Sequence, residues 1–129
     1  MKRENVDYIC SLYGYLIRLQ EIHWNTNYNS GHMLCDEIYD LIKDDMDRFA
    51  ECAQGIENVH FKIGDLKPML PNATNLKAMI EELSKETHTV RKTLERSEEY
   101  AGLVNVLDDI LEACGKYRYR STQVGGHDA

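Results

Sequence analysis

The stretch EIHWNTNYNSGHMLCDEIYDLIKDDMDRFAEC, residues 21–52, joins two predicted helices and carries two histidines with many carboxylates. Within it, NTNYNSG at residues 25–31 is rich in turn-forming residues, and Ser30 suits the N-cap of a following helix. Apolar residues recur at helical spacing on both sides of this break. The pattern predicts helices over about residues 4–25 and 32–54.

The remaining sequence predicts a second pair of helices behind a long connection. Gly55 is expected to end the second helix, and residues 55–73 then contain both prolines of the chain. A third helix should begin near Asn72 or Thr74 and end near Glu99, with a fourth following directly. Short first and third connections with a long middle one are typical of one particular arrangement of four helices.

The fold class predicted from this pattern is all-α, a ferritin-like four-helix bundle with a long crossover between helices two and three. The bundle should occupy residues 1–118 as one domain, followed by a flexible tail over residues 119–129. No strand pattern, internal repeat or second domain competes with this interpretation.

Composition favours an ordinary soluble protein, with 129 residues, of which 43% are hydrophobic and 29% charged. The first residues lack an apolar signal segment and no apolar run reaches the length of a membrane span, so we expect a cytoplasmic protein without membrane contact. The four cysteines form no CxxC pair, which argues against a structural zinc site. A net charge of −7 argues against nucleic-acid binding, although KYRYR at residues 116–120 could contact phosphate or simply complement a helix dipole.

Two pairs of candidate ligands lie in the second helix. His32 and Asp36 are four positions apart, as are Asp47 and Glu51, so each pair shares a helix face. Both pairs lie on the same stripe, but Asp36 and Asp47 are separated by roughly 16 Å along the axis. One metal ion cannot bind both, because its bonds to hard ligands are about 2.0–2.6 Å long.

A second copy of the chain could combine these pairs. A two-fold axis near Leu41 and Ile42, with the second helices antiparallel, places the first pair of one chain opposite the second pair of the other. His23, at the end of the preceding helix, could complete each composite site. Mixed imidazole and carboxylate ligands suit iron, and zinc remains possible. Alternatively, the acidic residues form a solvated face and His23 is a core histidine.

The motifs in this region resemble those of the Dps family, the mini-ferritins or DNA-binding proteins from starved cells. HWN at residues 23–25, HMLCD at 32–36 and DRFAE at 47–51 follow that family's pattern in order. LVNVLDDILE at residues 103–112 is similar to the opening of the family's last helix. The similarity is strongest over residues 19–52.

The resemblance implies a hollow dodecamer of ferritin-like subunits with two-fold interfaces through the second helix. It implies ferroxidase centres that oxidise Fe(II) with hydrogen peroxide or oxygen, store ferric mineral and so protect against oxidative stress. The implied ligands of the iron (Fe2+/Fe3+) are His23, His32 and Asp36 from one subunit, with Asp47 and Glu51 from its neighbour.

Other features of the motif region bear on this implied activity. Trp24 would lie near the implied centre, where it could absorb stray oxidising equivalents or serve as an interface aromatic. The loop over residues 24–31 is shorter than is usual in the family, and Cys52 replaces a basic residue. These departures leave open a shell protein of the same fold that has lost the chemistry. DNA binding is not expected, because only Lys2 and Arg3 provide basic charge at the N-terminus.

Overall fold

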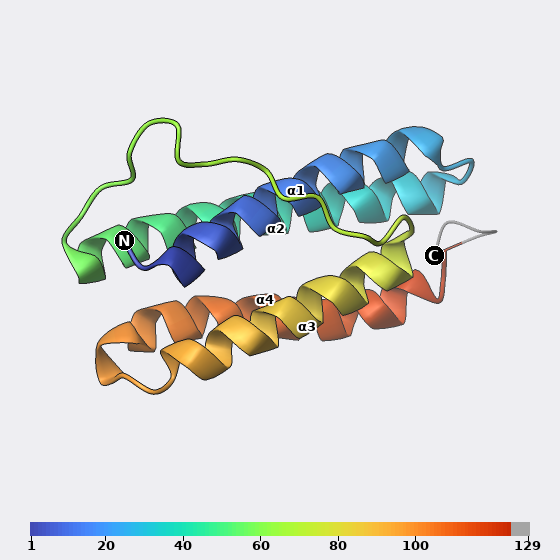
Figure 1. Ribbon diagram of the computed structural model, residues 1–129. Helices are drawn as coiled ribbons and strands as arrows, with labels where there is room; N and C mark the ends of the chain where they lie inside the picture. The colour runs from blue at the N-terminus through green and yellow to red at the C-terminus, as the bar shows by residue number, and fades with distance from the viewer. Residues whose placement is uncertain (125–129) are drawn as a thin grey trace.

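The computed structural model describes residues 1–124, which contain four α-helices, one short 3-10 helix and no strand (Figure 1). The predicted all-α class is therefore confirmed, and the four helices are compatible with the predicted bundle. The elements are α1 (Arg3–Asn25), α2 (Asn29–Glu57), α3 (Leu76–Leu94), η1 (Glu98–Tyr100) and α4 (Ala101–Ser121). Among the described residues, no helix is long and apolar enough to cross a membrane.

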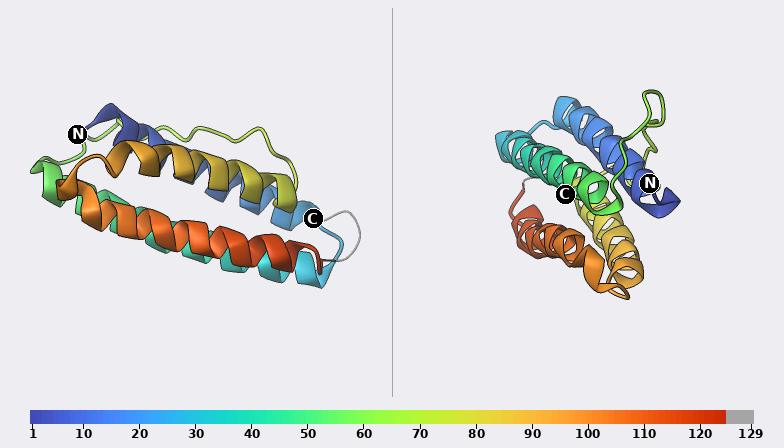
Figure 2. Two further views of the ribbon diagram at one scale, coloured as in Figure 1. Left: turned by 90° about the horizontal axis from the view of Figure 1, so that it is seen from below. Right: turned by 90° about the vertical axis from the view of Figure 1, so that its left-hand side faces the viewer.

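The four helices pack as two layers of two, which Figure 2 shows end-on. α1 packs against α2 and α3, and α4 packs against the same two helices. The connection over residues 58–75 runs the length of the bundle beside α1, so that α2 and α3 point in the same direction (Figure 1). One layer therefore consists of α1 and α2, whose outer face is free of the other two helices.

The core is continuous through the bundle and contains a few polar links between helices. The Tyr8 ring packs edge-on against Phe49 at 5.2 Å between centroids, and the Tyr8 hydroxyl lies 2.8 Å from that of Thr87. Tyr15 donates a hydrogen bond to Glu86. Each fully buried large apolar side chain stabilises the fold by about 1.5–3 kcal/mol, so these helices hold together through their shared core.

The long connection is fixed to α1 by a close approach of two backbones. The Met69 amide donates a hydrogen bond to the Cys10 carbonyl at 3.0 Å, and the Arg18 guanidinium donates one to the Pro71 carbonyl. Gly14 lies beneath this segment, where an added Cβ atom would stand 1.7 Å from the Met69 carbonyl oxygen. Only glycine permits such an approach.

Helix α2 is longer than the sequence predicts at both ends. It begins at Asn29, so Ser30 lies inside the helix, and its predicted role as N-cap is wrong. The helix also continues through Gly55 to Glu57, because a single glycine costs only about 1 kcal/mol in a helix that is held by packing. Asn58, with φ of 52°, ends it in the left-handed region.

Helix α3 begins later than expected. Its first residue is Leu76, which follows Thr74 by two residues and Asn72 by four, the positions near which the start was predicted. The Asn75 side chain is the N-cap, since it accepts a hydrogen bond from the Ala78 amide at 2.9 Å.

The second half of the chain differs from the predicted boundaries in two further places. Helix α3 ends at Leu94 and not near Glu99, because a turn and η1 precede α4. Helix α4 extends to Ser121, past the predicted end of the bundle at residue 118. Residues 125–129 of the predicted tail lie outside the described part of the chain.

Candidate metal centre

His23 approaches two other predicted ligands, His32 and Asp36, where α1 turns into α2. His23 lies in the last turn of α1, while His32 and Asp36 lie in the first turns of α2. Because only residues 26–28 separate the two helices, the end of α1 and the start of α2 lie at the same end of the bundle. The local sequence thus brings a histidine from one helix against a histidine and a carboxylate from the next.

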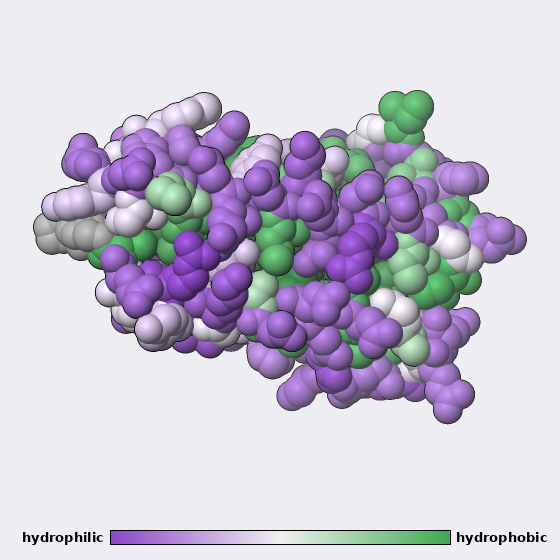
Figure 3. All heavy atoms as spheres, turned by 180° about the vertical axis from the view of Figure 1, so that it is seen from behind, coloured by the Kyte–Doolittle hydropathy of each residue, from purple (hydrophilic) through white to green (hydrophobic). Residues whose placement is uncertain are grey.

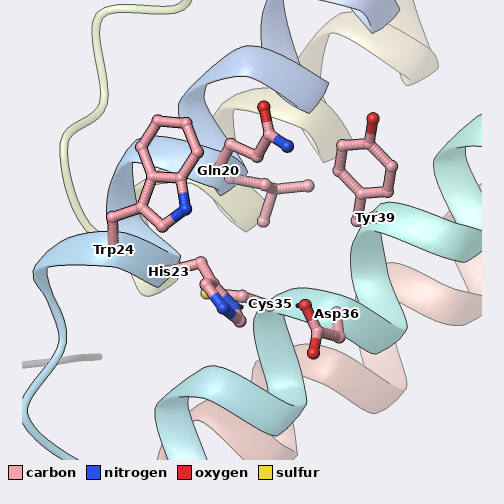
Figure 4. A pocket seen from close by; sticks show the side chains of 7 residues that line it. Gln20, His23, Trp24, Cys35, Asp36 and Tyr39 are labelled. Atoms are coloured by element: carbon pink, nitrogen blue, oxygen red, sulfur yellow. Dashed lines mark ion pairs between the residues drawn. The ribbon is translucent and has the colours of Figure 1, made fainter.

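The geometry of this cluster is compact. His23 Nδ1 lies 3.1 Å from Asp36 Oδ1, and Figure 4 shows the two side chains pointing toward each other from α1 and α2. The ring centroids of His23 and His32 are 4.5 Å apart, with the rings nearly perpendicular at 82°. The cluster therefore presents two imidazoles and one carboxylate on adjoining helices.

The Nδ1 atom of the His23 ring faces the Asp36 carboxylate. This Nδ1 atom is buried and makes no hydrogen bond, but it lies at ion-pair distance, 3.1 Å, from the Asp36 carboxylate. Buried polar atoms in native proteins nearly always have a partner, which is a protein group, an ordered water or an ion. The Asp36 side chain is 70% exposed, so its pairing with a charged imidazole would contribute little by itself.

An open hollow of about 210 Å³ lies beside this cluster. His23, Asp36, Trp24 and Tyr39 are among its lining residues (Figure 4). Trp24 is 70% exposed, so its indole borders both the hollow and the surface. A small ion or oxidant could reach the cluster from the outer face of the α1/α2 layer.

The remaining predicted ligands, Asp47 and Glu51, do not join this cluster within one chain. Both are exposed on α2, and neither makes a hydrogen bond or ion pair with any residue in 1–124. Across the same residues, no group of three or more histidine, cysteine, aspartate or glutamate side chains is arranged to hold a metal ion. A single subunit therefore has two separate sets of candidate ligands.

His60 is a further histidine near these ligands that the sequence did not indicate as a candidate. His60 and Glu51 line the same surface hollow at the end of α2, together with Asn58. The helix period gave no signal for His60, because the left-handed turn at Asn58 lies between it and α2.

The opposite side of α2, where it packs against α4, carries a separate charged network. Arg48 donates hydrogen bonds to Asp45 at 2.8 Å and to Asp109 of α4 at 3.1 Å. Burial raises the pKa of the Asp45 carboxyl, and the hydrogen bond from Arg48 offsets this only in part. The surface over α2 and α4 is mostly hydrophilic, with small separate apolar patches (Figure 3).

The basic segment at residues 116–120 is largely engaged within the bundle. Arg118 pairs with Glu81 of α3, and Arg120 pairs with Glu37 of α2. These contacts tie the end of α4 to its neighbours and occupy the two guanidinium groups that the sequence offered for phosphate binding.

The four cysteines behave as packing residues of the bundle. No disulfide links them, and three of the four are buried. Burial raises the pKa of Cys114 to about 12, which keeps that thiol protonated and unreactive at neutral pH.

Comparison with known proteins places the chain in a family without assigning it an activity. No curated protein and no solved structure matches the sequence significantly. The sequence model of the Family of unknown function (DUF5856) matches residues 23–120, a span that includes all five predicted ligands. Since this match covers most of the chain, the protein belongs to the DUF5856 family.

Proposed function

We propose that this protein is a Dps-like iron-binding protein that oxidises Fe(II) at centres shared between two subunits. Its bundle would be of the ferritin-like type, and its subunits would form a hollow cytoplasmic shell that stores ferric mineral.

 The observation that carries this proposal is the approach of His23 to both His32 and Asp36, which brings two imidazoles and one carboxylate to the junction of α1 and α2.

A second subunit would supply the ligands that one chain lacks. If two α2 helices lie antiparallel about a two-fold axis at the level of Leu41 and Ile42, Asp47 and Glu51 of the partner subunit face the His23 cluster. Ile42 is buried and Leu41 is half-buried. The axis would therefore lie at their level along α2 but on the solvent side of the helix. Six such dimers would make the dodecamer that the family resemblance implies.

The chemistry of this donor set suits iron as a substrate. Carboxylates neutralise the charge of Fe(II) and favour Fe(III). The imidazoles add further ligands but leave a coordination position open for an oxidant. Two Fe(II) ions supply the two electrons that reduce one hydrogen peroxide to two hydroxide ions. The hollow beside His23 and Asp36 gives the oxidant a path to the ions.

Replacement of one partner ligand tests this proposal. Asp47→Ala should slow aerobic or peroxide-driven Fe(II) oxidation by more than about tenfold, because ligand loss weakens metal sites at least as much as loss of their supporting contacts. The rate is followed by absorbance during loading. Asp44→Ala, which removes an exposed carboxylate of the same helix outside the ligand set, should oxidise Fe(II) as the wild type does. Wild-type rates in Asp47→Ala, with unchanged helicity, would overturn the site.

A second candidate is a shell or scaffold protein of the same fold that has lost the chemistry. It is favoured by the loop over residues 24–31, which is shorter than is usual in the family that the sequence resembles, and by Cys52 in place of a basic residue. An assembled shell that holds no iron after aerobic loading would support this candidate. DNA compaction is not favoured, since Arg118 and Arg120 are engaged by carboxylates of the bundle.

A further inference from the structure

The outer face of α2 carries one basic side chain among its carboxylates. Asp36, Asp40, Lys43 and Asp47 fall within about 60° of the helix circumference, given 3.6 residues per turn. All four are exposed. The only other basic residue between positions 36 and 51, Arg48, is held by Asp45 and Asp109 on the side of α4. Lys43 is therefore the single positive charge on this stripe.

Lys43 and Asp40 have no partners of their own in the described part of the chain. Neither side chain makes an ion pair or hydrogen bond with any residue in 1–124, although they are only three positions apart on α2. Both are thus available to a group outside the subunit.

The positions of these charges are self-complementary in an antiparallel pair of α2 helices. An axis midway between Leu41 and Ile42 places His32 opposite Glu51 and also places Asp36 opposite Asp47. The same axis places Asp40 opposite Lys43, and by symmetry this contact occurs twice. The register that aligns the two sets of candidate ligands thus also pairs the lone base with an acid.

We infer that the occupant of this face is a second copy of the chain, and that two reciprocal Asp40–Lys43 ion pairs set its register. This inference rests on the two-fold contact of the proposed function. Charge pairs at an interface contribute mainly to specificity and orientation, which is the role assigned to them here.

Apolar area for such a contact lies directly beside the charged stripe. Tyr13, Ile17 and Trp24 are exposed on α1 at spacings of four and seven residues, so they share one face of that helix. Trp24 lines the same hollow as Asp36 and Tyr39 of α2, which places the two stripes on one side of the molecule. Burial of exposed aromatic residues supplies the affinity that surface ion pairs lack.

Charge reversal tests the pairing in the full-length protein. Asp40→Lys or Lys43→Glu should raise the dissociation constant of the two-fold contact by at least about tenfold, since each reversal turns two attractions into two repulsions. The double variant Asp40→Lys/Lys43→Glu restores opposite charges and should return the constant to within about threefold of the wild type. Sedimentation velocity at low ionic strength, with a chelator present, measures these constants.

A matched reversal and an activity assay separate the outcomes. Asp44→Lys makes the same charge change one turn along α2 but does not face Lys43 in this register, so it should not weaken association. The inference is overturned by a monomeric wild type, by single reversals without effect, by a double variant that stays dissociated, or by equal weakening in Asp44→Lys. If the reversals behave as expected but no variant and no wild-type sample oxidises Fe(II), the pairing stands and the proposed function fails.

Discussion

Asp45 shows how one residue of α2 can oppose the stability of the bundle that it belongs to. Its side chain is only 8% exposed, between α2 and α4, and its carboxylate accepts a hydrogen bond from Arg48. Burial disfavours the ionised form and raises the pKa of this carboxyl above its ordinary value, while Arg48 lowers it by less. The ionised form at neutral pH is thus less favourable in the folded chain than in the unfolded one.

The sign of the resulting pH dependence follows from proton linkage. As pH falls through the raised pKa toward the unfolded value of about 4, the folded state binds more protons than the unfolded state. The contribution of Asp45 to the free energy of unfolding therefore increases as pH falls through this window. Below the window it does not change further. Asp45→Asn removes the titration, so the free energy of unfolding of the wild type should rise relative to the variant on acidification. Urea denaturation at several pH values measures the difference; parallel curves would contradict the assignment.

Single residues also mark where sequence-based prediction of helix ends fails. Ser30 has the right chemistry for an N-cap but lies inside α2, while Asn75 performs that role for α3 although two other polar residues precede it nearby. Serine, threonine and asparagine cluster before both helices. The choice among them depends on where packing positions the first turn, which local chemistry does not specify.

The connection over residues 58–75 is the element whose path depends most on one position. It crosses α1 above Gly14, where the two backbones come too close for any Cβ atom. Gly14→Ala should therefore push the segment away and destabilise the fold by about 1–3 kcal/mol, as overpacking does in other interiors. The midpoint of urea denaturation should fall accordingly.

Gly55→Ala is the matched control for this change. Gly55 also lies within a helix, but an added Cβ atom there meets no atom within 4 Å. Alanine should stabilise α2 by about 0.5–1 kcal/mol, because glycine loses more conformational freedom in a helix. If both variants shift the midpoint in the same direction, the close approach at Gly14 does not constrain the connection.

The helices themselves were predictable because each has a continuous apolar stripe of helical period. That stripe is strong over Leu12, Leu16 and Leu19 in α1, all of which are buried. The passage of α2 beyond Gly55 was not predictable in the same way. A glycine ends a helix only when no contact beyond it holds the next turn. Here the helix ends later, where the Gln54 carbonyl accepts hydrogen bonds from the amides of Asn58 and Val59.

At the scale of the molecule, the sequence could predict which residues approach within one subunit better than it could predict a complete site. His23 meets His32 and Asp36 because a short turn joins their helices, and turn length is readable from sequence. Asp47 and Glu51 lie far along α2, so any role with that cluster requires another subunit, whose placement no single chain specifies. Their part in a shared site stays a prediction.

Assembly and cation binding should be coupled if the two-fold contact forms as proposed. Asp36 of one subunit and Asp47 of the partner subunit would then face each other twice, at both ends of the contact. Like charges brought together at an interface oppose association unless a cation lies between them. A divalent ion that bridges them would bind the dimer more tightly than the monomer and would strengthen association by mass action.

Zn2+ is a suitable probe of this coupling, because it accepts the same ligands without redox chemistry. Relative to a chelator, Zn2+ should lower the dissociation constant of the wild-type contact by about tenfold or more, which corresponds to about 1.4 kcal/mol. In Asp47→Asn the repulsion and the ligand charge are both lost. This variant should therefore associate more tightly than the wild type in chelator, and Zn2+ should change its dissociation constant by less than about threefold. An equal response of both proteins would mean that cations act elsewhere on the surface. The coupling would then be absent, and charge pairing near the axis would be left as the only electrostatic determinant of the contact.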